Sequence, residues 1–149
     1  MNKALRKQLA RLSDQLCEIQ STLEKTFSLC SDIEDVNFAA LDFQKEFTLL
    51  NVTAMLETIG SVTDDIDEIR GDEIEKFENL SEGLQGSEKG EALETTAESL
   101  GYALEALESV ASVLNPEVNK FTHETLEEML GEAIENLNDV QDHLSDAQN

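Results

Sequence analysis

The chain has 149 residues, of which 33 are Asp or Glu and 10 are Lys or Arg, so its formal charge at pH 7 is −23. Charge of this sign repels phosphate, which excludes non-specific attraction to nucleic acid or to an anionic membrane and indicates basic partners. Hydrophobic residues make up 40% of the chain, yet aromatic residues are only 5%, Trp is absent and there is one Pro. This composition, rich in Ala, Leu and Glu and without the alternation of a β-sheet, predicts a single all-α domain over residues 1–149.

The sequence carries no signal for export or for a membrane. Its basic start lacks the apolar run of a signal peptide, and no segment approaches the roughly 20 apolar residues of a membrane span. Cys17 and Cys30 fall in one predicted helix, about 20 Å apart along its axis, which is too far for a disulfide between them. Because free thiols are typical of a reducing compartment, we expect a cytoplasmic protein.

Apolar residues in the first half of the chain recur with the spacing of heptad helices. Alternating steps of four and three residues separate Leu5, Leu9, Leu12, Leu16, Ile19 and Leu23. They predict a helix over residues 2–30, and two further apolar series predict a long helix over residues 37–80. Gly60 and Gly71 each cost about 1 kcal/mol relative to Ala inside a helix, so we expect a kink or break near residues 60–71.

The second half predicts a reversal followed by two helices. Three glycines within residues 79–90 indicate the reversal, with Ser87 as the N-cap of a helix over residues 87–114. The apolar row of that helix is Leu93, Ala97, Leu100, Leu104, Leu107, Ala111 and Leu114. The Asn115-Pro116 pair should end it, and the last helix, over residues 122–146, starts near Thr122 or Thr125. The apolar row of the last helix is Leu126, Leu130, Ala133, Leu137, Val140 and Leu144.

Apolar rows this narrow must pack on one another or on a second copy of the chain, which leaves a homodimer open. The sequence therefore predicts an all-α helical bundle of about four helices, with heptad seams and helical hairpins.

Carboxylates form rows along the predicted helices. Steps of three and four residues separate seven on the last helix: Glu124, Glu128, Glu132, Glu135, Asp139, Asp142 and Asp146. A second row begins Asp64, Glu68, Asp72 and Glu75, and a third, gapped row comprises Glu91, Glu94, Glu98, Glu105 and Glu108. No Lys or Arg follows Phe121, so the last helix accepts like-charge neighbours that cost about 0.2–0.5 kcal/mol each. Solubility alone would be one explanation of such rows, and a binding surface is the other.

The start of the chain has the opposite sign. Lys3, Arg6, Lys7 and Arg11 give residues 1–11 a charge of +4, so the rest of the chain carries −27, the total of −23 less this +4. Cations at a helix N-terminus oppose the helix macrodipole. We expect this turn to lie beside an acidic helix of the same chain or of a second copy.

Motifs for catalysis or metal binding are absent from the sequence. His123 and His143 are twenty residues apart, and neither cysteine has the spacing of a zinc site. The acidic run from Asp65 places Ile and Arg where a calcium loop needs an oxygen ligand and Gly. Enzymes that hold metal ions with carboxylates inside a four-helix bundle usually carry Glu-x-x-His pairs, which this chain lacks. We therefore expect no metal, no cofactor and no enzymatic activity.

The stretch from Asn79 to Glu91 reads N-L-S-E-G-L-Q-G-S-E-K-G-E. It resembles an N-L-P-E-G-L-Q-x-S-E-x-G-E pattern in small acidic helical proteins of phages and prophages, with Ser81 where Pro is common. The resemblance covers about a quarter of the chain and implies a mobile-element origin, hence action in the cytoplasm of a host cell. Small acidic proteins that block host nucleases or CRISPR effectors are a recurring class among such elements.

These patterns lead to two hypotheses of function. In the first, the carboxylate rows imitate phosphates, which lie about 3.4 Å apart along each strand, and the protein occupies the DNA- or RNA-binding channel of a basic host protein. That partner would be a CRISPR or restriction nuclease or another nucleic-acid-binding protein. In the second, the chain is a coiled-coil scaffold or chaperone that binds through its hydrophobic seams.

Overall fold

The computed structural model describes residues 1–32, 52–115 and 123–149, without the side chains of residues 29–32, 123 and 124. The described residues form four long α-helices and one short one. These are α1 (Lys3–Asp32), α4 (Val52–Glu78), α5 (Glu82–Gln85), α6 (Glu88–Leu114) and α7 (His123–Gln148). Residues 37–51 of the predicted second helix, and the predicted stop at Pro116, lie outside the described residues.

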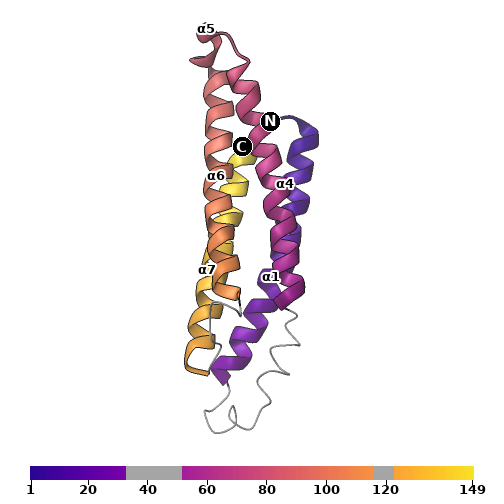
Figure 1. Ribbon diagram of the computed structural model, residues 1–149, viewed down its shortest axis with the longest axis vertical. Coiled ribbons are helices and arrows are strands. Elements are labelled where there is room, and N and C mark those ends of the chain that lie inside the picture. The colour runs from indigo at the N-terminus through magenta and orange to yellow at the C-terminus, as the bar shows by residue number, and fades with distance from the viewer. Residues whose placement is uncertain (33–51, 116–122) are drawn as a thin grey trace.

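The four long helices lie side by side in an antiparallel bundle, with the two chain ends near each other (Figure 1). Neighbours around the ring are α1 and α4, α4 and α6, α6 and α7, and α7 and α1. Hence α4 lies diagonally across from α7, and α1 from α6. Each helix is about 40–45 Å long. The prediction of an all-α helical bundle is confirmed.

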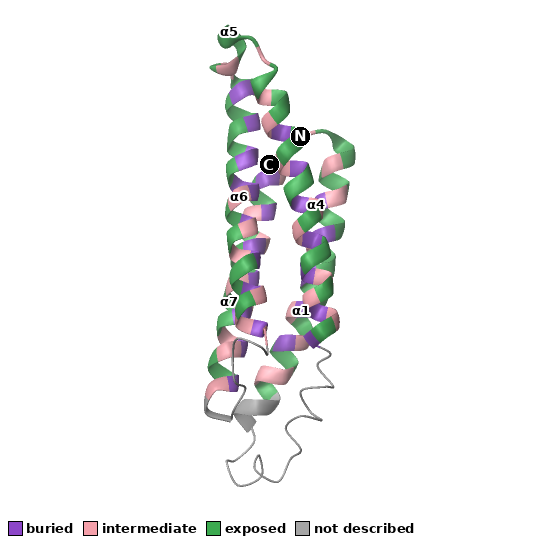
Figure 2. Cartoon of the chain, in the orientation of Figure 1, coloured by how far each residue is buried: buried purple, intermediate pink, exposed green. Residues whose placement is uncertain are grey.

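One continuous hydrophobic core runs the length of the bundle, and the buried residues lie on the inner sides of the helices (Figure 2). If each helix is divided into heptads a to g with the core at a and d, the predicted rows of α1 and α7 are the buried ones. Leu9, Leu12, Leu16 and Leu23 are almost inaccessible, as are Leu130, Ala133, Leu137, Val140 and Leu144. Leu5 and Phe27, toward the ends of the α1 row, are half-buried.

Helix α4 has no break at the glycines. It runs unbroken from Val52 to Glu78 through Gly60 and Gly71, so of the expected kink or break near residues 60–71 the break does not occur, and the kink stays a prediction. Two glycines cost about 2 kcal/mol together, whereas each buried Ile or Val contributes about 1.5–3 kcal/mol. Ile59, Val62 and Ile66 are at most 1% exposed, and their burial outweighs the glycine cost.

In α6 the buried row differs from the predicted one. Ala103 and Val110 are fully buried, whereas Leu104 and Ala111 are half-buried. The predicted row combined position a (Leu93, Leu100, Leu107, Leu114) with position e (Ala97, Leu104, Ala111), and the second core row is position d (Thr96, Ala103, Val110). A helix with extensive contacts on two sides needs three apolar rows, and α6 packs against both α4 and α7.

The residues that flank the core set how closely neighbouring helices pack. Pair α6–α7 has the most extensive contact and α1–α4 the least of the four neighbouring pairs. On α6, the g positions that flank the core are small: Ser99, Ala106 and Val113. The corresponding positions of the α1–α4 pair are polar: Gln8, Gln15 and Thr22 on α1, and Thr58, Asp65 and Asp72 on α4. Small side chains allow close approach, whereas long polar ones must stay hydrated and keep the helices apart.

The reversal between α4 and α6 depends on Ser87 and Gly90. Ser87 is the N-cap of α6, and its hydroxyl accepts a hydrogen bond from the Gly90 amide at 3.4 Å, as predicted. A Cβ on Gly90 would lie 2.0 Å from the Gln85 carbonyl oxygen, so this position requires glycine. The Gln85 side-chain amide donates to the Leu80 carbonyl at 3.2 Å and ties α5 to the end of α4. These contacts give the motif from Asn79 to Glu91 a structural role.

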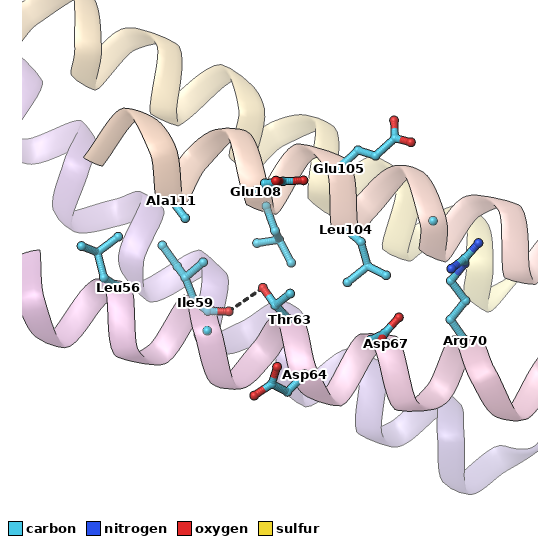
Figure 3. Close-up of a pocket in the computed structure, with 13 residues that line it drawn as sticks. Leu56, Ile59, Thr63, Asp64, Asp67, Arg70, Leu104, Glu105, Glu108 and Ala111 are labelled. Carbon is cyan, nitrogen blue, oxygen red and sulfur yellow. Dashed lines mark hydrogen bonds between the residues drawn. The ribbon is translucent and has the colours of Figure 1, made fainter. Parts of the chain in front are cut away.

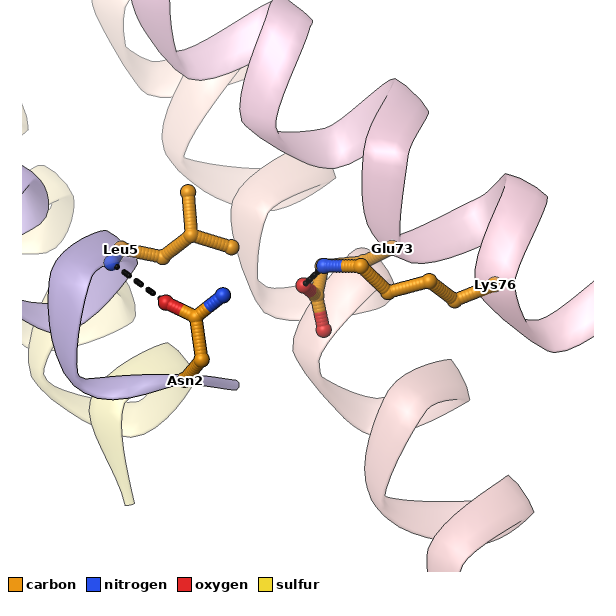
Figure 4. Close-up of polar contacts among 4 residues, drawn as sticks. All are labelled: Asn2, Leu5, Glu73 and Lys76. Carbon is orange, nitrogen blue, oxygen red and sulfur yellow. Dashed lines mark hydrogen bonds and ion pairs between the residues drawn. The ribbon is translucent and has the colours of Figure 1, made fainter.

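A carboxylate occupies a core position at the end of α4. Glu73 follows Ile66 and Ile69 in the buried row and is 0% exposed. Lys76 Nζ donates to its Oε1 at 2.6 Å, and Oε2 has no hydrogen-bond partner among the described residues. Figure 4 shows both side chains facing the first turn of α1, where the Leu5 amide donates to Asn2 Oδ1 at 2.9 Å. A buried carboxylate with one half-exposed partner is a net cost to stability.

We expect Ala103→Leu to destabilise the fold and Ala111→Leu to be tolerated. Ala103 is fully buried in the core, where the larger side chain overpacks its neighbours at a cost of about 1–3 kcal/mol. Ala111 is half-buried at the edge of the α4–α6 contact and has an open side. Urea unfolding measures both, and a larger loss for Ala111→Leu would contradict the observed register of α6.

We expect Glu73→Leu to raise the free energy of unfolding by about 1 kcal/mol or more, because an apolar side chain replaces a carboxylate with an unpartnered oxygen. Lys76→Ala, which removes the partner and leaves the charge buried, should lower the free energy of unfolding. Urea unfolding of both variants checks this. If Glu73→Leu lowers the free energy of unfolding instead, the Glu73 carboxylate has a favourable partner in addition to Lys76.

Candidate functional site

The carboxylates of α7 form a straight row on the outside of the bundle. Among the predicted residues the exposed ones are Glu128, Glu132, Glu135, Asp139, Asp142 and Asp146, and the side chain of Glu124 is not described. They occupy heptad positions c and f, away from the core. From Glu128 to Asp146 the helix rises about 27 Å, so a carboxylate follows about every 5 Å.

These carboxylates have no cation to neutralise them within the described part of the chain. The one ion pair with both partners among the described residues joins Lys76 to Glu73, on another helix. Hydrogen bonds between α7 and α1 use neutral groups instead: the Gln141 side-chain amide donates to the Ser13 carbonyl at 3.1 Å, and the Gln20 side-chain amide donates to Asn138 Oδ1 at 2.7 Å. Among the described residues the row therefore faces solvent with no cation paired to it.

The predicted α4 carboxylates are exposed but do not form a single straight row. Asp64, Glu68 and Glu75 lie at outer heptad positions, whereas Asp72 lies at position g, turned toward α1. Since α4 is diagonal to α7, the two predicted rows lie on opposite corners of the bundle. A partner with one flat surface cannot contact both rows at once.

The structure instead brings Asp64 together with carboxylates of α6 around an open groove of about 560 Å³ between α4 and α6. Ile59 and Leu107 form its floor, and Leu56, Leu104 and Ala111 its apolar walls. Asp64 and Asp67 line it on the α4 side, and Glu105 and Glu108 on the α6 side. In Figure 3, Asp67 and Arg70 lie on the side of α4 that faces α6, and Asp64 and Glu105 lie on the outer edges.

The position of Arg70 follows from the antiparallel register of α4 and α6. Position e of α4 (Leu56, Thr63, Arg70) faces position e of α6 in reverse order (Ala111, Leu104, Ala97). At one end of the groove Arg70 Nε donates to the Ala97 carbonyl at 3.2 Å, which a Thr or Leu at this position could not do. A Cβ on Gly101 would lie 3.3 Å from Arg70 Nε, so the glycine makes room for the guanidinium.

Three groove carboxylates were not among the predicted site residues. Asp67 lies one helical turn beyond Asp64, and Glu105 and Glu108 belong to the third, gapped row. A signal was present in the sequence: Leu56, Thr63 and Arg70 are spaced by seven, as are Ala97, Leu104 and Ala111. To predict that these two rows face each other, one must know that α4 and α6 are neighbours in the bundle, and the sequence alone does not show this.

The remaining candidate groups do not assemble into a metal site in the part of the chain that the structure describes. Cys17 is exposed and unpaired. The ring of His143 contacts that of Tyr102, with centroids 5.4 Å apart, and the His123 side chain is not described. No helix among the described residues is both long and apolar enough to cross a membrane.

The basic first turn lies beside an acidic helix of the same chain, as expected. Helix α1 packs against α7, and the start of α1 and the end of α7 lie at the same end of the bundle (Figure 1). The negative end of the α7 macrodipole partly offsets the cations there. Lys3, Arg6, Lys7 and Arg11 are exposed, and none forms an ion pair with a described carboxylate.

In comparisons with known proteins, no family model, curated protein or solved structure matches the chain.

We expect salt to stabilise the fold, because the exposed carboxylates repel one another and few are paired. Raising NaCl from about 0.01 M to about 1 M shortens the Debye length from about 30 Å to about 3 Å and should raise the urea midpoint. The variant E135Q/D139N/D142N, with three fewer charges on α7, should show a smaller rise. A midpoint that is independent of salt would mean that the carboxylates are paired.

Proposed function

We propose that the protein is a phage-type inhibitor that acts as an acidic nucleic-acid mimic. Its α7 carboxylate row occupies the DNA- or RNA-binding channel of a basic host protein, such as a CRISPR or restriction nuclease. The observation that carries the proposal is the row from Glu128 to Asp146, exposed, evenly spaced and unpaired with any described cation. The spacing of about 5 Å is wider than the roughly 3.4 Å between phosphates along a strand, but it is of the same order.

The physical driving force would be the one that nucleic acid itself uses. A channel lined by Lys and Arg holds condensed anions, and the carboxylate rows hold cations. Docking releases both, so the affinity falls steeply as the salt concentration rises. The net charge of −23 also steers a basic partner toward the protein at low salt.

The bundle supports this function by holding the row rigid. On the inner side of α7, Leu130, Leu137 and Leu144 are at most 1% exposed and fix the helix along its length. A preorganised row loses little conformational entropy on binding, in contrast to a disordered acidic tail. The carboxylates therefore need little rearrangement to meet a partner.

The alternative, a coiled-coil scaffold or chaperone, has less support. The apolar rows on which it depends are already buried within the chain's own bundle. Among the described residues the exposed large hydrophobic side chains are Leu84, on α5, and Tyr102, on α6, which lie on different parts of the surface. Neither makes a seam for a second coiled-coil helix.

The test compares two triple variants with the same charge change. E135Q/D139N/D142N neutralises the middle of the α7 row, and D14N/E18Q/E24Q neutralises three exposed carboxylates of α1. Tagged full-length protein is used to capture partners from a bacterial lysate, with elution by a NaCl series and by duplex DNA. We expect the unmodified protein and the α1 variant to capture a nucleic-acid-binding protein that DNA displaces.

For the α7 variant we expect the affinity for that captured protein to fall about tenfold, equivalent to about 1.4 kcal/mol. Equal binding by both triple variants would overturn the assignment to α7. A partner that resists salt and is not displaced by DNA would overturn mimicry itself and favour the coiled-coil alternative.

A further inference from the structure

We propose that the α4–α6 groove is a docking site for a basic amphipathic helix of the partner protein. The inference rests on the proposed function in taking the partner to be basic, and it adds a second contact surface, distinct from the α7 row. It assigns a role to Asp67, Glu105 and Glu108, which the α7 row does not use.

The chemistry of the groove selects the occupant. Its floor and walls are apolar, with Ile59 and Leu107 buried and Leu56, Leu104 and Ala111 half-buried. Its four carboxylates are divided equally between α4 and α6, and none pairs with a described cation. A helix with one apolar row and Lys or Arg on both sides of it matches this pattern in both hydrophobicity and charge.

The dimensions of the groove agree with a short helix. From Leu56 to Arg70 helix α4 rises about 21 Å, which is the length of about four turns of a docked helix. Arg70 marks one end of the groove, where its guanidinium is bound to the Ala97 carbonyl. The cationic part of a docked helix would therefore lie over Leu56 to Asp67, about three turns, away from this like charge.

Gly60 supplies an independent argument. It lines the groove in the middle of α4, where glycine costs about 1 kcal/mol relative to Ala. A Cβ built there meets nothing within 4 Å, so no close contact within the described chain requires glycine at this position. Glycine at position 60 leaves this part of the groove without a side chain, so that the backbone of a bound helix can approach the apolar floor.

The chain contains a matched control for this position. Gly71 is also inside α4, and a Cβ built there also meets nothing within 4 Å, but it does not line the groove. Gly60→Leu and Gly71→Leu therefore make the same change in volume, charge and helix propensity on one helix. They differ in whether the new side chain fills the groove.

The probe is a synthetic helix-forming peptide of about 16 residues, with leucines at i, i+4, i+7 and i+11 and Lys or Arg on both sides of that row. A scrambled peptide of equal composition controls for charge alone. Binding to the full-length protein is measured by fluorescence anisotropy at about 0.15 M salt, where long-range electrostatics are largely screened.

We expect the amphipathic peptide to bind more tightly than the scrambled one. Gly60→Leu should weaken it about tenfold, which corresponds to about 1.4 kcal/mol, and Gly71→Leu by less than about twofold. D67N/E108Q should also weaken binding and reduce its salt dependence, because one carboxylate is lost from each side of the groove.

Three outcomes would overturn the proposal. Equal binding of the peptide to Gly60→Leu and Gly71→Leu would place it elsewhere. A change of oligomeric state in Gly60→Leu alone, seen by light scattering, would make a second copy the occupant. A loss of thermal stability in Gly60→Leu alone would make a segment of the same chain the occupant.

The two proposals fail separately. In one outcome, the α7 triple variant no longer binds the captured partner, whereas Gly60→Leu still binds both the partner and the peptide. The proposal of nucleic-acid mimicry is then supported, and the proposed groove site is wrong. If Gly60→Leu loses the peptide but the lysate yields no nucleic-acid-binding protein, the groove stands as a site for basic helices and the proposed function fails.

Discussion

The apolar rows that recur every seven residues determine where every other group of this protein lies. Each long helix has a core row that must leave water, and at about 25 cal/mol per Å² of buried apolar area this term exceeds any local preference along the chain. It keeps α4 helical through Gly60 and Gly71 and holds Glu73 in the core layer despite its charge. Exposure of most carboxylates follows from the same rows, because positions b, c and f face away from the core.

The rows beside the core decide the shape of the bundle. Small residues such as Ala106 on α6 permit a close approach to α7, and polar residues such as Gln15 and Asp65 keep α1 and α4 apart. Between α4 and α6 the flanking row is mixed, with Leu104 and Ala111 in the same row as Ala97. Ala111 on α6 and Gly60 on α4 leave space beside the larger side chains, and both line the groove.

The sequence predicted the parts of the fold that depend on local chemistry. The ends of α1, α6 and α7 fall within about two residues of their predicted positions, within the usual uncertainty of helix ends, and the Ser87 cap is where the pattern indicated. The core of α6 was misassigned because rows a with d and a with e both advance by steps of three and four. Leu104 looked more suitable for the core than Ala103. Only contact with α7 on one side and α4 on the other decides between them, and that information is not local.

Exposure of the candidate carboxylates was predictable for the same reason, but their grouping was not. Which acidic rows meet depends on helix adjacency, so Asp64 joined Glu105 and Glu108 rather than continuing in line to Asp72. Folding also does not explain why these residues share one sign. Positions 128, 132, 135, 139, 142 and 146 touch no core, and mixed charges there would gain pairs of about 0.3–0.5 kcal/mol each. Folding does not require these six positions to be uniformly negative, and their repulsion reduces stability. The packing of the bundle therefore does not explain their shared sign, whereas contact with a basic partner would.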